Sequence, residues 1–226
     1  MKCTCILLTC CIHPAMTSLL PVKNNLLPDT YGLVLCGGRS SRMGTDKSML
    51  LYYDKPQRYH LYDMLQPFCE KVFISCNAEQ AKNMEAGYAF LPDDPSYANM
   101  GPMAALLTAF TRFPQKNMLL IGCDYPFLMA VHLRRFSAYC NGERAVSFYN
   151  EQAAVYEPLL AWYPYEVFDA IKKKQEAGEY SLQHFLKSSG AVKFCPGNTK
   201  SMTSIDTYKD FIDVSTRLFH ERLTFF

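Results

Sequence analysis

The feature that most constrains this chain is a short apolar segment that ends in paired glycines. Residues 31–35 (Tyr-Gly-Leu-Val-Leu) have the pattern of a buried strand, and Gly37 and Gly38 follow it. Because glycine has no Cβ, the backbone at this strand end can approach a ligand closely. The same loop then adds two cations and two hydroxyls, namely Arg42, Lys47, Ser40 and Ser41. Backbone N–H groups with fixed positive charge suit a polyphosphate, so the sequence predicts a phosphate-binding loop.

The spacing of this loop separates it from two common nucleotide motifs. No Gly-Lys-Ser/Thr follows at the Walker distance, and a third glycine comes too late for a dinucleotide fingerprint. The motif Leu-x-Gly-Gly-x-Ser-x-Arg-Met-Gly-x-Asp-Lys, which begins at Leu35, resembles the signature of nucleotidyltransferases, and most of all the molybdenum cofactor guanylyltransferases. The resemblance implies that Arg42 and Lys47 are catalytic residues that hold the triphosphate. It also implies that the nucleotide contacts Leu35, Cys36, Gly37, Gly38 and Lys47.

An acidic turn and a helix start form a second landmark. Residues 91–95 read Leu-Pro-Asp-Asp-Pro, and Gly101-Pro102 opens an apolar segment in which proline suits the first helical turn. In the family that the loop resembles, an aspartate here contacts the nucleotide and the Gly-Pro helix closes over the base. The resemblance therefore assigns nucleotide contacts to Asp94 and Gly101. The neighbouring Asp93 could contact the nucleotide in place of Asp94. Alternatively, the acidic turn has no nucleotide contact and only caps a helix.

A third landmark is Asp124, which follows four apolar residues at 118–121. Such a run is typical of a central parallel strand, and open α/β sheets bind ligands at the carboxyl ends of their strands. A carboxylate that faces a triphosphate there would hold Mg²⁺, and the resemblance gives Asp124 that catalytic and nucleotide-binding role. The alternative is a helix N-cap for the segment near Pro126. The resemblance also counts Ser75, at the end of the expected strand 71–75, among the nucleotide contacts.

The last landmark departs from the family pattern. Ser204 and Asp206 stand where the family has two asparagines, and Tyr208 stands where it has proline. Asp206 could complete the Mg²⁺ shell as a second oxygen ligand, or it could cap the last helix from Thr207 onward. Both interpretations stay open.

The resemblance implies one reaction, transfer of GMP from GTP to the terminal phosphate of molybdopterin, with Mg²⁺ as cofactor and release of pyrophosphate. The Gly37-Gly38 pair is the guanine form of the motif, since cytidylyltransferases for this cofactor tend to have Leu-x-Ala-Gly. A cytidylyltransferase, or another small-molecule phosphate nucleotidyltransferase, keeps the chemistry and changes the substrate. The second alternative is a non-catalytic nucleotide-binding partner of a molybdoenzyme. The substrates implied are GTP and molybdopterin, and a molybdoenzyme or a cofactor-delivery protein is a further partner that this function allows.

Composition agrees with one enzyme-sized domain. The chain has 226 residues, is 49% hydrophobic and carries a net charge of +2, so neither nucleic acid nor a membrane surface has an electrostatic reason to bind. Ten cysteines without a Cys-x-x-Cys pair favour free, buried thiols and a cytoplasmic protein. Residues 1–29, with three prolines between positions 13 and 29, are expected to be a disordered extension, and residues 30–226 a single nucleotidyltransferase domain.

The order of elements predicts an α/β fold with a doubly wound, mainly parallel sheet and helices on both faces, a Rossmann-like nucleotidyltransferase fold. The expected strands are 31–36, 71–75, 88–91, 118–122, 144–148, 155–162 and 191–195. The expected helices are 57–68, 79–84, 102–113, 130–140, 165–177 and a last one from Thr207.

Overall fold

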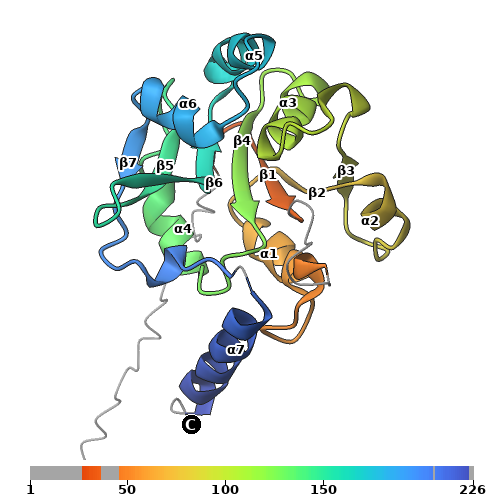
Figure 1. Ribbon diagram of the computed structural model, residues 1–226, viewed down its shortest axis with the longest axis vertical. Helices are drawn as coiled ribbons and strands as arrows, with labels where there is room; N and C mark the ends of the chain where they lie inside the picture. Colours follow the sequence, from red (N-terminus) through yellow and green to blue (C-terminus); the bar gives the residue numbers. More distant parts are fainter. Residues whose placement is uncertain (1–26, 37–45, 206, 224–226) are drawn as a thin grey trace, which may run out of the picture.

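The computed structural model describes residues 27–36, 46–205 and 207–223. Its centre is a seven-stranded sheet with the order β3-β2-β1-β4-β6-β5-β7 (Figure 1). The strands are β1 (Thr30–Leu35), β2 (Lys71–Cys76), β3 (Phe90–Pro92), β4 (Asn117–Gly122), β5 (Val146–Asn150), β6 (Val155–Tyr163) and β7 (Val192–Phe194). Among the described strands only β6 runs against its neighbours, so the sheet is mainly parallel, as the sequence predicts.

Helices cover both faces of this sheet. The α-helices are α1 (Gln57–Leu65), α2 (Ala78–Lys82), α3 (Pro102–Arg112), α4 (Ala130–Ser137), α5 (Phe168–Glu176), α6 (Leu182–Ser188) and α7 (Tyr208–Leu223). Short 3-10 turns are η1 (Lys47–Met49), η2 (Pro95–Tyr97), η3 (Tyr165–Val167) and η4 (Lys200–Met202). One apolar core lies between the sheet and α1 with α4, and a second lies between the sheet and α3 with α5 and α6. This two-sided burial confirms the predicted doubly wound fold.

The central strand β1 contributes side chains to both cores. All six of its residues are buried. Leu33 and Leu35 pack with α3, whereas Val34 and the following Cys36 pack with α1. Because successive side chains of a strand point to opposite faces, an apolar run of this kind is stable only when both faces are covered.

Local sequence signals set several helix boundaries. The predicted helix 57–68 ends at Leu65 with Gln66 as its C-cap, because the next residue, Pro67, has no backbone N–H to continue the helical hydrogen bonds. Asn77 caps α2 in a capping box with Gln80, which starts that helix one residue before the predicted 79. Strand β5 begins at Val146 and not at 144, since residues 142–144 form a bend before the strand.

A small third cluster joins α7 to the rest of the fold. Val214 and Leu218 of α7 pack with Tyr52, Phe127 and Ile205. In Figure 1 this helix lies beyond the end to which β4 points. The C-terminal helix therefore contacts the edge of the sheet at which the parallel strands end.

Candidate active site

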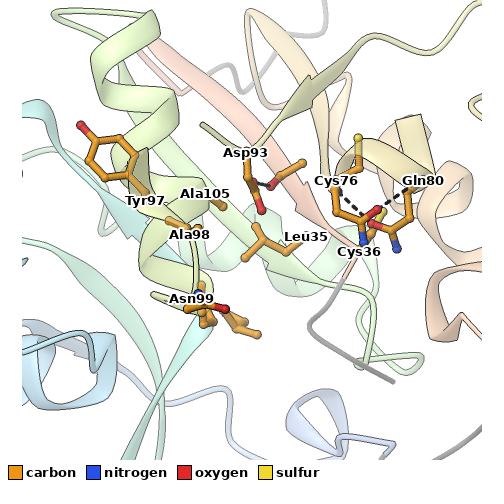
Figure 2. A pocket seen from close by; sticks show the side chains of 15 residues that line it. Leu35, Cys36, Cys76, Gln80, Asp93, Tyr97, Ala98, Asn99 and Ala105 are labelled. Carbon is orange, nitrogen blue, oxygen red and sulfur yellow. Dashed lines mark hydrogen bonds between the residues drawn. The ribbon is translucent and has the colours of Figure 1, made fainter. Parts of the chain in front are cut away.

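A cavity of about 350 Å³ opens at the carboxyl ends of β1 and β2, beside the start of α3 (Figure 2). This is the edge at which open α/β sheets bind their ligands. Four of the residues predicted to contact a nucleotide line it together, namely Leu35, Cys36, Ser75 and Gly101. The other lining residues are Cys76, Asn77, Gln80, Asp93, Tyr97, Ala98, Asn99, Pro102, Ala104, Ala105 and Leu159.

Asp93 and Ser75 form a polar pair inside this cavity. The Ser75 hydroxyl donates to Oδ1 of Asp93 at 3.0 Å, and the backbone N–H of Asp93 donates to the carbonyl of Cys76. Partial burial raises the pKa of Asp93, while the Ser75 bond lowers it by a smaller amount. Figure 2 shows the Asp93 side chain above Leu35 and pointing toward it, and Asp93 is one of the residues that line the cavity. A carboxylate in this position can accept hydrogen bonds from a ligand that presents two neighbouring donors.

Asp94, the position that the motif spacing selected, lies outside the residues that line the cavity. Its carboxylate accepts from the N–H of Ser96 at 2.8 Å and from the Ser96 hydroxyl at 2.7 Å, which makes it the N-cap of η2. These hydrogen bonds lower the pKa of Asp94. Its own N–H donates to Thr108 on α3. The structure thus places Asp93 in the cavity and Asp94 in the cap, and nucleotide contact by Asp94 stays a prediction.

Gly101 shapes the opposite wall. It precedes α3 with φ +57° and ψ −142°, a conformation that essentially only glycine adopts at low cost. Pro102 then occupies the first helical position, where its missing N–H has no consequence. Together they turn the chain so that the N-terminus of α3 faces the cavity.

Lys47 and Asp124 are joined by the backbone of Ile205. Nζ of Lys47 donates to the carbonyl of Ile205 at 2.8 Å, and the N–H of Ile205 donates to the carbonyl of Asp124 at 3.0 Å. Asp46, the residue before Lys47, is itself held in place, because its carboxylate caps η1 and accepts from Gln80 of α2 at 2.9 Å. Three segments that are distant in sequence therefore meet at one point: the end of the phosphate loop, the end of β4 and the segment before α7.

Glu157, which was not among the predicted site residues, brings a second carboxylate to the same region. Strand β6 bulges here, since Ser147 pairs with Ala161 while Phe148 pairs with Glu157. Bulges often direct side chains into functional sites. The Tyr125 hydroxyl donates to Glu157 at 2.9 Å. Burial raises the pKa of Glu157, and the negative charge of Asp124 adds to this effect.

Several predicted site residues lie outside the described part of the chain. These are Gly37, Gly38, Arg42 and Asp206, and their roles stay predictions. Within the described residues no group of three or more His, Cys, Asp or Glu side chains is arranged to hold a metal ion. No helix in that part of the chain is both long and apolar enough to cross a membrane.

Comparisons with known proteins agree with this geometry. The chain is 27% identical to the molybdenum cofactor guanylyltransferase of Pseudomonas fluorescens Pf0-1 over 189 residues, which cover 82% of this chain and 93% of that protein. It is 28% identical to the molybdenum cofactor biosynthesis bifunctional protein of Synechocystis sp., of which it spans about half, 52%. Molybdopterin-guanine dinucleotide biosynthesis protein A from Archaeoglobus fulgidus has a similar fold, with a TM-score of 0.67 at 21% identity, covering 83% of this chain and 97% of that one. Residues 32–192 match the family described as the MobA-like NTP transferase domain, and the chain belongs to that family.

Proposed function

We propose that this protein transfers GMP from GTP to the terminal phosphate of molybdopterin and releases pyrophosphate. The observation that carries the proposal is the cavity at the strand ends, which gathers Leu35, Cys36, Ser75 and Gly101 around the carboxylate of Asp93. The relatives named molybdenum cofactor guanylyltransferase support the choice of both substrates. On this reading residues 30–226 form one catalytic domain, residues 1–29 are an extension, and the enzyme works in the cytoplasm.

Asp93 supplies a physical reason for guanine. The Watson–Crick edge of guanine presents N1–H and the 2-amino group as adjacent donors, and a carboxylate can accept from both. Cytosine and adenine present an acceptor nitrogen in the corresponding position, which a carboxylate repels. The hydrogen bond from Ser75 fixes one oxygen of Asp93 and thereby the orientation of the carboxylate. Discrimination of this kind is large because the wrong base leaves polar groups unpaired.

Lys47 is the described cation that we expect to contact the triphosphate. It follows the glycine-rich loop, and its link to Ile205 keeps its charge near Asp124. A lysine acts on phosphate oxygens as a point charge, and Arg42 would add a second charge from within the loop. Phosphoryl-type transfer depends chiefly on in-line positioning and neutralisation of charge. The phosphate of molybdopterin is already ionised, so it attacks the α-phosphorus without a general base.

Mg²⁺ fits the donor set at the end of β4. Asp124 offers a half-buried carboxylate there, with the carboxylate of Glu157 nearby. Magnesium in nucleotide enzymes is usually held by one or two carboxylates together with substrate phosphates, so a complete protein cage is not required. When bound, the ion neutralises charge that develops on the phosphate oxygens. Asp124 would hold it, and Asp206 is the second ligand that the family pattern implies.

The test is a pyrophosphate-release assay with purified protein, Mg²⁺ and molybdopterin, run in parallel with GTP and CTP at equal concentration. Steady turnover that prefers GTP is expected. A preference for CTP would refute the guanylyltransferase assignment, and binding of GTP without turnover would favour the non-catalytic alternative. The Gly38→Ala variant, which adds a Cβ beside the expected base, should reduce the difference in turnover between GTP and CTP.

A further inference from the structure

Three cysteines stand side by side at the carboxyl ends of β2, β1 and β4. Leu35 pairs with Ser75 on one side and with Gly122 on the other, so the next residues, Cys76, Cys36 and Cys123, are adjacent in the same order. The ladder continues to this point, because the N–H of Cys123 donates to the carbonyl of Leu35 at 3.1 Å. All three thiols belong to the core cluster on the α1 face and are free.

Cys36 and Cys123 follow paired residues of two neighbouring strands, at a spacing that a disulfide can span. Adjacent strands lie about 4.8 Å apart, within the range of about 4.4–6.8 Å that Cα atoms of disulfides span. Both side chains point to the same face of the sheet, since both pack in the same cluster. The pairing of Leu35 with Gly122 puts these two side chains next to each other, and the interaction with the Cys123 thiol is the largest influence on the pKa of Cys36. The Cys76 thiol has no comparable effect on the pKa of Cys36.

The surroundings of Cys36 favour its thiolate. The hydrogen bond from Cys123 lowers the pKa of Cys36 most, and the Ser48 hydroxyl and the charge of Arg58 act in the same direction, against burial and Asp46. Arg58 is only 2% exposed. Its guanidinium donates to the Tyr59 hydroxyl and to the carbonyl of Asn83, and within the described chain it forms no ion pair with a carboxylate. A buried cation of this kind is stabilised by a nearby anion.

The other described cysteines lack these features. Burial raises the pKa of Cys69 and of Cys76 to about 12, and it also raises the pKa of Cys140 and of Cys123, which therefore reacts second and as a thiol. Cys195 is the most exposed cysteine of the described residues, and its pKa is raised as well. Because the thiolate is the reactive form of cysteine, we expect the buried Cys36 to react faster than the more exposed Cys195.

An oxidant can reach Cys36 through the nucleotide cavity. Cys36 and Cys76 both line that cavity, and Figure 2 shows them on its wall opposite Tyr97 and Asn99. A cavity of about 350 Å³ admits a molecule as small as hydrogen peroxide. A nucleotide bound in the same cavity would block this path.

We propose that Cys36 and Cys123 form an oxidation site at the nucleotide cavity, which a peroxide converts to a disulfide. The Cys36 thiolate attacks one peroxide oxygen, the O–O bond breaks, and with one proton the products are a sulfenic acid on Cys36 and water. The sulfur of Cys123 then attacks the sulfur of Cys36, the S–O bond breaks, and the hydroxyl leaves as water with the Cys123 proton. The two thiols are oxidised by two electrons in total, and one peroxide is reduced to two molecules of water.

The disulfide would join the residue before Gly37 to the residue before Asp124. A covalent bond at this point constrains the start of the phosphate loop and the end of β4 together, so oxidised protein should lose nucleotide transfer and regain it on reduction. The inference goes beyond the proposed function, since the disulfide can be detected whether or not the protein transfers GMP.

The experiment treats the full chain with hydrogen peroxide, digests it without reduction and maps the cysteine peptides by mass spectrometry. A Cys36–Cys123 disulfide is expected, with Cys36 reacting at least about tenfold faster than the more exposed Cys195 at neutral pH. GTP with Mg²⁺ should slow the reaction, and dithiothreitol should reverse it. In Cys123→Ser the sulfenic acid on Cys36 should persist and be trapped by dimedone, whereas the matched variant Cys76→Ser should still form the disulfide.

Three outcomes would overturn the proposal. The first is a Cys36–Cys76 disulfide, which would show that the wrong neighbour was chosen. The second is oxidation of Cys195 or of the N-terminal cysteines while Cys36 stays reduced. The third is disulfide formation at an unchanged rate in the presence of saturating GTP, which would exclude the cavity as the route. If Cys123→Ser is unstable, Cys123→Ala gives the same test of the second thiol, and circular dichroism of each variant verifies the fold.

Discussion

Replacing Asp93 with asparagine tests whether Asp93, and not the neighbouring Asp94, recognises the guanine base. The substitution keeps the size of the side chain and its bond to Ser75, but it removes the negative charge and turns one acceptor into an amide donor. A hydrogen bond to a charged group contributes about 1.5–3 kcal/mol. We therefore expect kcat/KM for GTP to fall by about tenfold to 150-fold, since about 1.4 kcal/mol corresponds to a factor of ten.

The assay compares GTP with inosine triphosphate, which lacks the 2-amino group. If Asp93 accepts from both N1–H and the 2-amino group, the wild-type protein should favour GTP and Asp93→Asn should lose most of that preference. Inosine triphosphate already lacks one of the two donors, so the substitution should affect its kcat/KM less. The cycle of two proteins and two nucleotides isolates the interaction between the carboxylate and the amino group.

Asp94→Asn is the matched control. Asparagine caps helices about as well as aspartate, so the η2 cap should survive and GTP kinetics should change much less than in Asp93→Asn. A large loss in Asp94→Asn with little effect of Asp93→Asn would refute our interpretation of the cavity. That result would support Asp94 as the residue that contacts the nucleotide, as the motif spacing predicts.

The other predictions concern the remaining parts of the site. Asp124→Asn should lower kcat by about a hundredfold or more and weaken Mg²⁺ dependence while the circular dichroism spectrum is retained, and near-normal turnover would exclude Asp124 as the metal ligand. Lys47→Ala should weaken GTP binding far more than guanosine binding in calorimetric titrations, because lysine acts on the phosphates, and equal losses would contradict that role. Gly101→Ala places a side chain at φ +57°, so it should cost about 1–3 kcal/mol and lower the melting temperature by several degrees, which a thermal unfolding scan can measure. Because burial raises the pKa of Asp93, its carboxylate is protonated at a less acidic pH than usual, and GTP affinity should fall as pH drops through that raised pKa, but not in Asp93→Asn.

The sequence was sufficient for the parts of the fold that local pattern determines. The run from Tyr31 to Leu35 is apolar on both faces, and its two-sided burial follows directly. The reversed direction of β6 could not be predicted in this way, because an apolar strand has the same local pattern in a parallel and an antiparallel pair. The bulge that places Glu157 near Asp124 depends on pairing between β5 and β6, which no local motif encodes.

At the acidic turn, the residues around Asp94 indicate a helix cap, but the prediction relied on the spacing from Gly101 and chose Asp94 as the nucleotide contact. Asp94 precedes Pro95 and stands two residues before Ser96, a typical arrangement for an N-cap with proline in the first turn. That signal points to a capping role and leaves Asp93 as the side chain directed to the cavity. Counting back from Gly101 selects Asp94 instead, since a motif records distance along the chain and not the direction of a side chain.

The backbone of Ile205 explains why the site needs the C-terminal part of the chain. Its carbonyl accepts from Lys47 and its N–H donates to Asp124, so one residue holds the end of the phosphate loop and the end of β4 together. Its side chain packs with Val214 and Leu218 of α7, and that packing keeps the backbone in place. The polar link thus depends on apolar burial in a helix outside the sheet. Residues after 192 lie beyond the matched family region, yet they complete the pairing of a predicted phosphate-binding lysine with a predicted metal ligand.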